Sequence, residues 1–337
     1  MYSLLSNAHA RKPEDSHTFP EHQKEDAADD ECSSSCSSTD DALAEMLGLT
    51  SLTSVTSDVD DRSLPPSTCT LDSDVDYEAL AAQYDARGII PLPISVLRSA
   101  LNRSAAAATH AKDTVKTYEA IGGRGRELTR IEKFLEFGEW RLICDKAREA
   151  ASEVLKKKKK KKEEERLAVF KEKLNYKPPG GKGFAPHLDG PSLAQTGHGG
   201  EGAFVTVMVA IDEMTEANGC LEVCEGRWTA ENKVLTVQVD KDGDPDREGR
   251  PGEIPSAVAD GLEWTKVVCK PSQVYMFSSL LPHRSGTNRT VLQRRAAFIT
   301  LCEGDFRDEY YDTMAEKRRR FEKPENLEDE WLATVPK

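Results

Sequence analysis

Residues 204–211 are "FVTVMVAI", a short apolar segment rich in valine, and similar segments follow it along the chain. They are "KVLTVQV" at 233–239, "TKVVCK" at 265–270, "QVYMFS" at 273–278 and "RAAFITLC" at 295–302. Clusters of Gly, Pro, Asn and Asp separate them, as turns between strands require. Several short strands with turn signals between them predict an all-β sandwich or barrel.

Helical patterns flank this β-rich region. The stretch 77–102, "YEALAAQYDARGIIPLPISVLRSALN", predicts a helix, a glycine turn, a short strand and a second helix. Apolar residues have helical spacing over 127–155 and again over 308–323. We therefore expect a mainly β core with flanking helices.

The charge of the chain is concentrated at its N-terminus. Residues 1–76 hold 17 acidic and 4 basic residues, which accounts for the whole formal net charge of −13. This segment is rich in Ser, Thr and Asp and has only two aromatic residues, Tyr2 and Phe19. Such a composition predicts a disordered acidic tail over 1–76, followed by one globular domain over 77–337. A weakly apolar stretch within 41–55 is a candidate docking segment for a protein partner. The neutral body gives no support for nucleic-acid binding.

A low-complexity run, "KKKKKKKEEE", occupies residues 156–165. It predicts a solvated helix extension or inserted loop, since the glutamates can pair with the lysines along a helix. The alternative is a nuclear-import signal in the lysines at 156–162. No apolar run approaches the ~18 residues of a membrane span, and the N-terminus lacks the apolar core of a signal peptide. We expect a cytoplasmic protein, with nuclear import as the alternative, that is neither secreted nor membrane-bound.

Eight cysteines are present, including two C-x3-C pairs, Cys32/Cys36 and Cys220/Cys224. Neither pair has the second pair that a structural zinc site needs. The cysteines of the body are expected to be buried thiols in a reducing compartment.

Two histidines and one aspartate form a candidate metal site. His187 and Asp189 lie two positions apart in "FAPHLDG", and side chains at i and i+2 of a strand project to the same face. His283 follows the apolar segment "VYMFSSLL", and Arg294 comes eleven positions later at the start of another. Two neutral imidazoles and one carboxylate suit the facial triad of non-haem iron(II) oxygenases, which leaves metal positions open. Arg294 can then form a bidentate salt bridge with the far carboxylate of a 2-oxo acid co-substrate.

Three segments resemble the phytanoyl-CoA dioxygenase family of Fe(II)/2-oxoglutarate oxygenases: "NYKPPGGKGFAPHLD" at 175–189, "MVAIDEMTEANGCLEV" at 208–223 and "HRSGTNRTVLQR" at 283–294. The resemblance implies a double-stranded β-helix, which is a jelly-roll, cupin-like core. It also implies Fe(II), 2-oxoglutarate and O2 as cofactors and co-substrates, with ascorbate as a further candidate.

The same resemblance implies roles for single residues. The iron ligands would be His187, Asp189 and His283. Arg294 would anchor 2-oxoglutarate, and Ser285 matches a family position that also contacts it. Lys173 and Met208 are carried over to co-substrate binding by alignment alone, because the family has other residue types there.

The sequence departs from the family pattern in two loops. It has "KPSQVYMF" at 270–277, where the family usually has Gly-Asp, and "EGRW" at 225–228, where the family has "PGSH". Both changes leave the ligands intact, and both fall on loops that can face the substrate.

Other interpretations of these residues remain open. His187 and Asp189 can be a surface pair, and Arg295 can replace Arg294 as the anchor. His198, in "TGHGGEG", can be a fourth ligand or a loop histidine at the mouth of a pocket.

The expected reaction is hydroxylation of a small organic substrate with release of succinate and CO2. One alternative is a zinc-dependent hydrolase that uses the same two histidines and one carboxylate, but it gives no role to Arg294. Another is a non-catalytic interaction protein built around the acidic tail. The family acts on acyl-CoA, amino-acid-like compounds, phosphonates and secondary metabolites. The terminal "VPK" is not a peroxisomal tripeptide, so acyl-CoA oxidation is not favoured.

Overall fold

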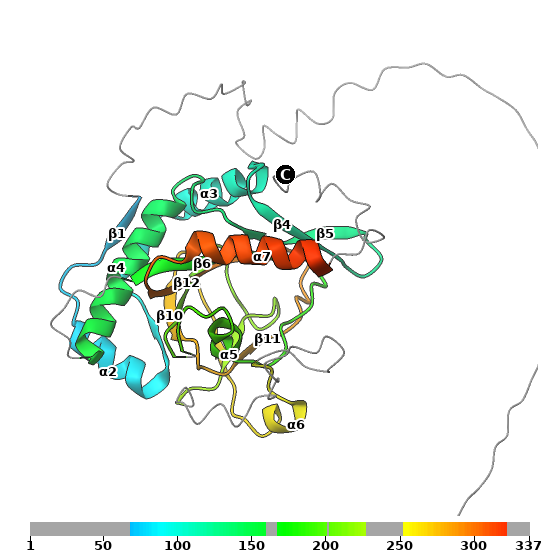
Figure 1. Cartoon of the computed structure of the whole chain (residues 1–337). Helices are drawn as coiled ribbons and strands as arrows, with labels where there is room; N and C mark the ends of the chain where they lie inside the picture. Colours follow the sequence, from blue (N-terminus) through cyan, green and yellow to red (C-terminus); the bar gives the residue numbers. More distant parts are fainter. Residues whose placement is uncertain (1–67, 160–166, 201, 227–251, 322–337) are drawn as a thin grey trace, which may run out of the picture. The chain divides into compact units, whose positions relative to one another are not determined.

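The computed structural model describes residues 68–159, 167–200, 202–226 and 252–321 (Figure 1). The acidic segment 1–67, the larger part of the Lys/Glu run and the expected strand at 233–239 lie outside these residues. Within the described part, the chain is mainly β with flanking helices, as predicted.

The largest sheet has seven antiparallel strands. Their order across the sheet is β2 (Ile89–Pro91), β10 (Val274–Ser278), β7 (Val205–Ala210), β12 (Arg294–Glu303), β6 (Leu167–Lys177), β5 (Arg126–Glu132) and β4 (Val115–Ala120). The long strands β6 and β12 pair through ten positions, with one register shift between Thr300 and Leu301.

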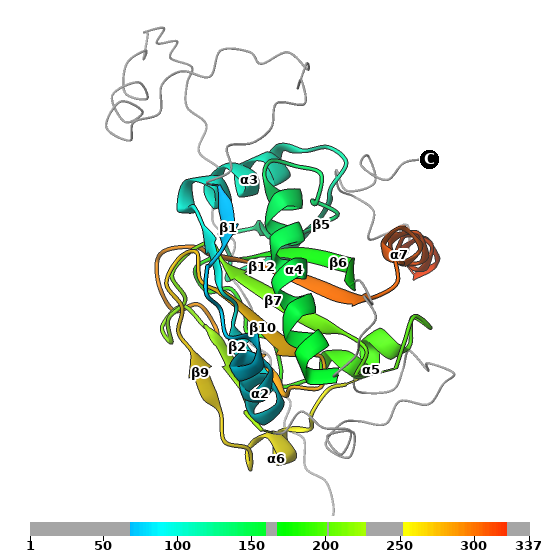
Figure 2. The same ribbon diagram turned by 90° about the vertical axis from the view of Figure 1, so that its left-hand side faces the viewer.

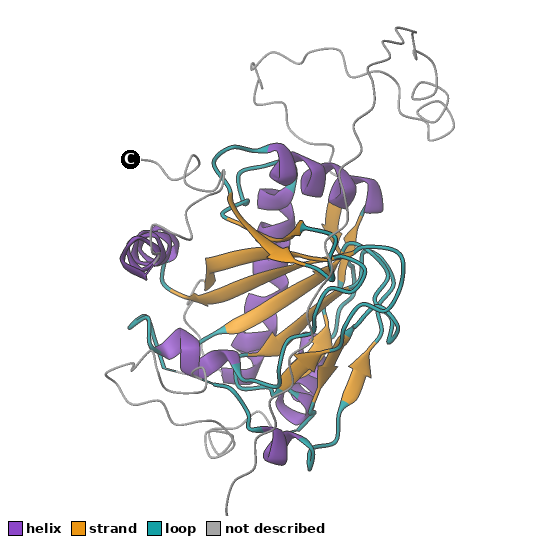
Figure 3. Cartoon of the chain, turned by 90° about the vertical axis from the view of Figure 1, so that its right-hand side faces the viewer, coloured by secondary structure: helices purple, strands orange, loops and turns teal. Residues whose placement is uncertain are grey.

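A second antiparallel sheet packs against the first. Its strands are β11 (His283–Ser285), β8 (Leu221–Val223) and β9 (Thr265–Val267), in that order. One apolar cluster joins Met208 and Phe277 of the large sheet to Leu221 and Val267 of the small one. Two antiparallel sheets facing each other across shared side chains form the predicted jelly-roll core (Figure 3).

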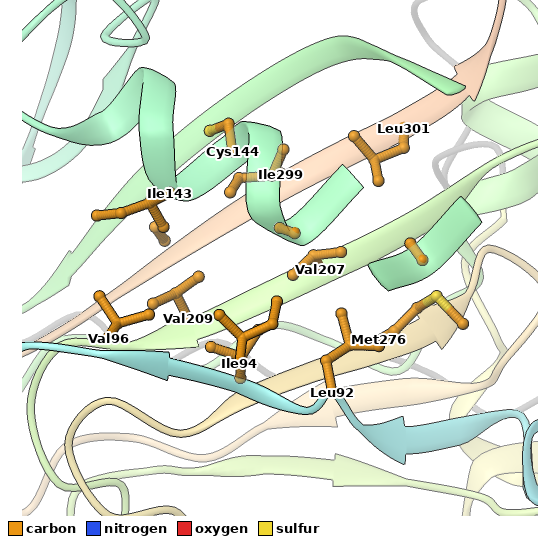
Figure 4. Close-up of a cluster of buried hydrophobic side chains, with 14 of the residues drawn as sticks. Leu92, Ile94, Val96, Ile143, Cys144, Val207, Val209, Met276, Ile299 and Leu301 are labelled. Atoms are coloured by element: carbon orange, nitrogen blue, oxygen red, sulfur yellow. The ribbon is translucent and has the colours of Figure 1, made fainter. Parts of the chain in front are cut away.

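Strand alternation decides which side chains face the inside of this core. On β7, Val205, Val207 and Val209 belong to one apolar cluster, whereas Met208 belongs to the cluster between the sheets. The valine side packs against α4 (Trp140–Lys159), whose Ile143 and Cys144 lie close to Val207 and Ile299 in Figure 4. Burying each such side chain contributes about 1.5–3 kcal/mol.

Two more helices, α2 (Tyr77–Arg87) and α3 (Arg98–His110), add buried residues to the same cluster (Figure 2). The predicted helix, glycine turn and second helix over 77–102 are confirmed, but two short strands, β2 and β3 (Ile94–Val96), stand where one was predicted. Gly88 ends α2 with a left-handed φ of 75°, which glycine adopts without steric cost.

The expectation of one helix over 127–155 is wrong in its first part. Residues Arg126–Glu132 form β5, and α4 begins only at Trp140. Arg130 pairs with Asn175 of β6, so a partner distant in sequence overrides the local apolar spacing. The hairpin strand β4 was not anticipated.

Regular structure also begins earlier than residue 77. Strand β1 (Cys69–Leu71) pairs with β3 (Ile94–Val96), and Cys69 is only 3% exposed. Helix α4 continues to Lys159, so the first lysines of the Lys/Glu run extend a helix, as one interpretation of the sequence predicted.

A buried ion pair holds the last described helix, α7 (Arg307–Phe321), against the outside of β6. Glu172 is fully buried and accepts hydrogen bonds from the Arg307 guanidinium, including one of 3.0 Å from Nε. The Tyr311 hydroxyl lies 3.2 Å from the same carboxylate. No helix among the described residues is long and apolar enough to cross a membrane.

Candidate metal centre

Backbone pairing brings the two candidate histidines together. The N–H of His187 donates to the carbonyl of His283 at 2.9 Å, and the N–H of His283 donates back at 3.0 Å. This antiparallel bridge places the two imidazole ring centroids 4.1 Å apart. His187 therefore extends the edge of the small sheet beside β11.

Asp189 reaches the same point from a different element than expected. It is the first residue of the short helix α5 (Asp189–Ala194), and the preceding Leu188 is still extended. Its carboxylate oxygens lie 3.8 Å from His187 Nε2 and 3.9 Å from His283 Nε2. One ligand atom from each of the three residues lies within 4.8 Å of the other two, which suits a shared metal ion.

Hydrogen bonds fix the form of both imidazoles. Nδ1 of His187 lies 2.7 Å from the Ala185 carbonyl, and Nδ1 of His283 lies 2.9 Å from the Leu281 carbonyl. A carbonyl only accepts, so each Nδ1 carries the proton and each Nε2 keeps a free lone pair toward Asp189. Such orientation by a carbonyl is typical of metal-binding histidines.

Electrostatics favour the same donor set. Burial lowers the pKa of His187 to about 4, with a contribution from the neighbouring His283, so its imidazole is neutral. Burial alone would raise the pKa of Asp189, but its interactions with His283, His187, Lys171 and Lys173 lower it to about 2. Two imidazole nitrogens and one ionised carboxylate therefore face each other, and this set fits iron(II).

A cavity opens beside these residues and contains Arg294 at its inner end. Arg294 is only 4% exposed and donates from Nη2 to the Gly219 carbonyl at 2.5 Å. Its Nε is buried and has no hydrogen-bond partner among the described residues. Burial lowers the pKa of Arg294 to about 10, so the guanidinium remains charged at neutral pH.

Its neighbour Arg295 points away from the cavity. Arg295 forms a bidentate salt bridge with Asp212, with both N–O distances at 2.8 Å. Phe298 and Thr300, which alternate with Arg294 along β12, line the cavity. The pleat of β12 thus leaves one unpaired arginine inside and one paired arginine outside.

Lys177 is a cavity residue that the sequence did not single out. Its Nζ donates to Ser285 Oγ at 2.9 Å, to the Gly286 carbonyl at 2.6 Å and to the Gly219 carbonyl at 3.2 Å. Ser285 Oγ also accepts from the Phe184 N–H at 3.1 Å. Because its oxygen accepts twice, Ser285 keeps its own hydroxyl proton for a third partner in the cavity. The lysine of the "KPP" motif was the available signal.

The remaining candidates differ in whether they line the cavity. Lys173 lines the cavity on the side of Asp189. Met208 is fully buried with Phe277 between the sheets and is absent from the cavity lining, although Thr206 on the same face belongs to it. His198 stacks on Phe306 at 4.6 Å and lies outside the metal cluster. Cys220 and Cys224 are buried and form no disulfide with each other, as expected.

Comparisons with known proteins agree with this geometry. A family model described as phytanoyl-CoA dioxygenase (PhyH) matches residues 75–296. A 2-aminoethylphosphonate dioxygenase from the uncultured bacterium HF130_AEPn_1 is 32% identical over 209 residues, which are 60% of this chain and 71% of that protein. A methylphosphonate hydroxylase from Gimesia maris is 38% identical over 157 residues, which are 45% of this chain and 52% of that protein. Among solved structures, the non-haem α-ketoglutarate-dependent carbocyclase SnoK from nogalamycin biosynthesis has a similar fold. It matches with a TM-score of 0.50 at 15% identity and covers 78% of this chain and 97% of that chain.

Proposed function

The chain belongs to the phytanoyl-CoA dioxygenase family of non-haem iron oxygenases, and from this premise we propose that it hydroxylates a small organic acid of the phosphonate class. As a member of this family it is a dioxygenase that uses Fe(II), 2-oxoglutarate and O2. In the proposed reaction, substrate, 2-oxoglutarate and O2 become hydroxylated substrate, succinate and CO2.

The observation that supports an acidic substrate is the charge of the cavity. Seven lysine and arginine residues line it: Arg130, Lys171, Lys173, Lys177, Lys182, Arg284 and Arg294. Asp189 and the exposed Glu119 are the acidic residues of the lining. An anionic substrate bound beside the anionic co-substrate would neutralise this excess of positive charge better than a neutral substrate would. The two relatives named above act on phosphonates by their names.

In this proposal His187, Asp189 and His283 hold the iron, which supplies the activation of O2 when bound. The residues fit that task because both Nε2 lone pairs and an ionised carboxylate converge. Open metal positions then face the cavity, where co-substrate and substrate bind.

Arg294 is the proposed anchor for the far carboxylate of 2-oxoglutarate. Its buried Nε lacks a partner, and a bidentate carboxylate would supply one. The hydroxyl of Ser285 is the second donor, held in place by Lys177 and the Phe184 N–H. Arg294 is buried and Ser285 is half-buried, and the low local dielectric there strengthens each charge-assisted hydrogen bond.

Succinate release tests the reaction. With Fe(II), 2-oxoglutarate and O2, we expect methylphosphonate or 2-aminoethylphosphonate to stimulate succinate formation by the full-length chain. Anaerobic addition of 2-oxoglutarate to the Fe(II)-loaded protein should produce a weak visible charge-transfer band. Hydrolysis of a substrate without 2-oxoglutarate would instead indicate the zinc hydrolase.

Single substitutions test the proposed ligands. His187→Ala, Asp189→Ala and His283→Ala should each abolish succinate formation and weaken Fe(II) binding by at least about tenfold, as loss of a ligand predicts. His198→Ala is the control and should leave Fe(II) binding unchanged, because His198 packs on Phe306 away from the cluster. Full turnover by any of the three ligand variants would refute the assignment.

A further inference from the structure

A second group of basic residues faces the cavity away from Arg294. Lys171 and Lys173 are two positions apart on β6, so their side chains project to the same face, and Arg130 lies on the neighbouring strand β5. Lys173 pairs in register with Phe298, whereas Lys177 pairs with Arg294. Lys173 and Lys177 are four positions apart on this strand, which separates their backbones by about 13 Å. The proposed co-substrate anchor therefore does not account for the charge of Lys171, Lys173 and Arg130.

These three cations have too few carboxylates around them. Asp189 and Glu132 are the acidic residues whose charges favour the protonated forms of Lys171 and Lys173. Asp189 belongs to the candidate metal centre, which leaves Glu132 as the other carboxylate whose charge favours the protonated forms of both lysines. Like charges at close range in a partly dry site are unfavourable unless an anion binds between them.

Unpartnered polar atoms lie around the same space. Arg130 Nε is buried without a hydrogen-bond partner among the described residues, and so is the Oγ1 of Thr206. Thr206 is only 2% exposed, lines the cavity and pairs in register with Thr300, which in turn pairs with Lys171. A buried hydroxyl without a partner is uncommon in a folded protein and indicates a missing ligand or water.

We propose that Arg130, Lys171, Lys173 and Thr206 form a subsite for a doubly charged tetrahedral oxyanion, the phosphonate group of the substrate. This inference rests on the proposed function and assigns its substrate group to named residues. Three basic side chains match an anionic group, and donors on three strands match oxygens that point in different directions.

The position of this subsite also suits the reaction. Lys171 and Lys173 lie close enough to Asp189 for their charges to lower its pKa. A phosphonate held there keeps its carbon chain beside the metal centre, against Phe277 and Phe298 of the cavity wall. A short substrate then reaches the metal while its charged end stays fixed.

The wild-type protein provides the first test. The full-length chain is loaded with Fe(II) and 2-oxoglutarate without oxygen, so that no turnover occurs, and ligand binding is measured by calorimetry. Methylphosphonate, which can carry two negative charges, should bind at least about tenfold more tightly than methanesulfonate, which has the same shape and can carry only one. Equal affinity, or no methylphosphonate binding, would overturn the proposal.

Matched substitutions locate the site. Lys171→Met, Lys173→Met and Arg130→Met should each weaken methylphosphonate binding by about tenfold or more, and Thr206→Val by less. Binding of 2-oxoglutarate should remain within about threefold of wild type in each variant, which also shows that the variant is folded. Lys182→Met is the control, because Lys182 is an exposed residue at the rim of the same cavity.

The possible results separate the two proposals. Unchanged methylphosphonate affinity in the lysine variants, or an equal loss in Lys182→Met, would overturn the subsite. Tight methylphosphonate binding that depends on Lys171 and Lys173, without any succinate formation in air, would keep the subsite and refute the proposed hydroxylation.

Discussion

Arg294 and Arg295 are adjacent in sequence, but the strand pleat gives them different environments. Arg295 has a carboxylate partner in Asp212, whereas Arg294 is buried with an unpartnered Nε. The spacing from His283 favoured Arg294 as the co-substrate anchor from the sequence alone. Its place in the cavity supports that choice and makes the two arginines a matched pair for mutation.

We expect Arg294→Ala to weaken 2-oxoglutarate binding by about 30- to 1000-fold. This range corresponds to the loss of about 2–4 kcal/mol from a charge-assisted pair in a partly dry pocket. Arg295→Ala should change co-substrate affinity little, and both variants should retain Fe(II) binding. Calorimetric titration with 2-oxoglutarate measures the effect, and the reverse ranking would exclude Arg294 as the anchor.

Lys177 should make co-substrate binding depend on pH. Burial and the charge of Arg294 lower the pKa of Lys177 to about 7, so it is partly neutral in the free protein. A bound carboxylate favours the charged form, so binding above this pH takes up a proton. We expect the affinity for 2-oxoglutarate to fall as pH rises above about 7, by at most about tenfold per pH unit.

Calorimetry in buffers of different ionisation enthalpy measures this proton uptake. Lys177→Met should abolish the uptake and weaken binding, whereas Lys182→Met should preserve both. Uptake that persists unchanged in Lys177→Met would assign it to another group.

At the residue scale, spacing along the chain indicated which residues come together. The H-x-D pair and His283 form one cluster and Arg294 lines the cavity beside it, whereas their roles as metal ligands and anchor stay predictions. The contact of Lys177 with Ser285 joins residues 108 positions apart, and no local pattern predicts such a pair. Met208 lies on the interior face of β7, but it is packed inside the core and does not line the cavity. The local sequence does not encode how deep in the core a residue lies.

At the scale of elements, α7 depends on a buried ion pair. Burial alone would lower the pKa of Arg307, but its hydrogen bond to Glu172 raises it. Arg307→Met leaves the fully buried Glu172 without its cation and should lower the free energy of unfolding by about 3–5 kcal/mol. Urea denaturation measures this change.

Two further variants complete the stability experiment. Glu172→Leu combined with Arg307→Met should recover part of the loss, because no uncompensated charge then remains. Arg87→Ala removes a partly exposed salt bridge to Glu225 and should cost at most about 1 kcal/mol. A loss in Arg307→Met no larger than that in Arg87→Ala would show that α7 is held by its apolar contacts alone.

Strands and helices were predicted best where the local sequence pattern alone determines the structure. The apolar segments at 204–211 and 273–278 contain strands β7 and β10, and the segment at 295–302 lies within β12. Strand β5 was mistaken for helix because its apolar spacing is compatible with both periods, and pairing with β6 decides the outcome. The role of Asp189 as the first residue of α5 likewise depends on a turn at Leu188 that the sequence did not reveal.

At the scale of the whole molecule, the start of the folded domain is open to a truncation test. A chain beginning at Arg62 should retain stability and Fe(II) binding, because β1 and the Asp76 cap of α2 remain. A chain beginning at Tyr77 loses the buried Cys69 and that cap, and it should be less stable by at least about 2 kcal/mol. Thermal melting and Fe(II) titration compare the two. Equal stability would place the boundary at residue 77, and loss of Fe(II) binding in the longer chain would assign the acidic segment to the site.

The bridge between His187 and His283 also sets when the metal centre can form. His283 lies 96 positions after His187 in the chain. At a synthesis rate of roughly 5–20 residues per second, about 5–20 seconds pass on the ribosome between the two histidines. During that interval His187 and Asp189 exist without the third ligand and without the strand that orients them. The complete set of three ligands therefore exists only after translation has passed β11.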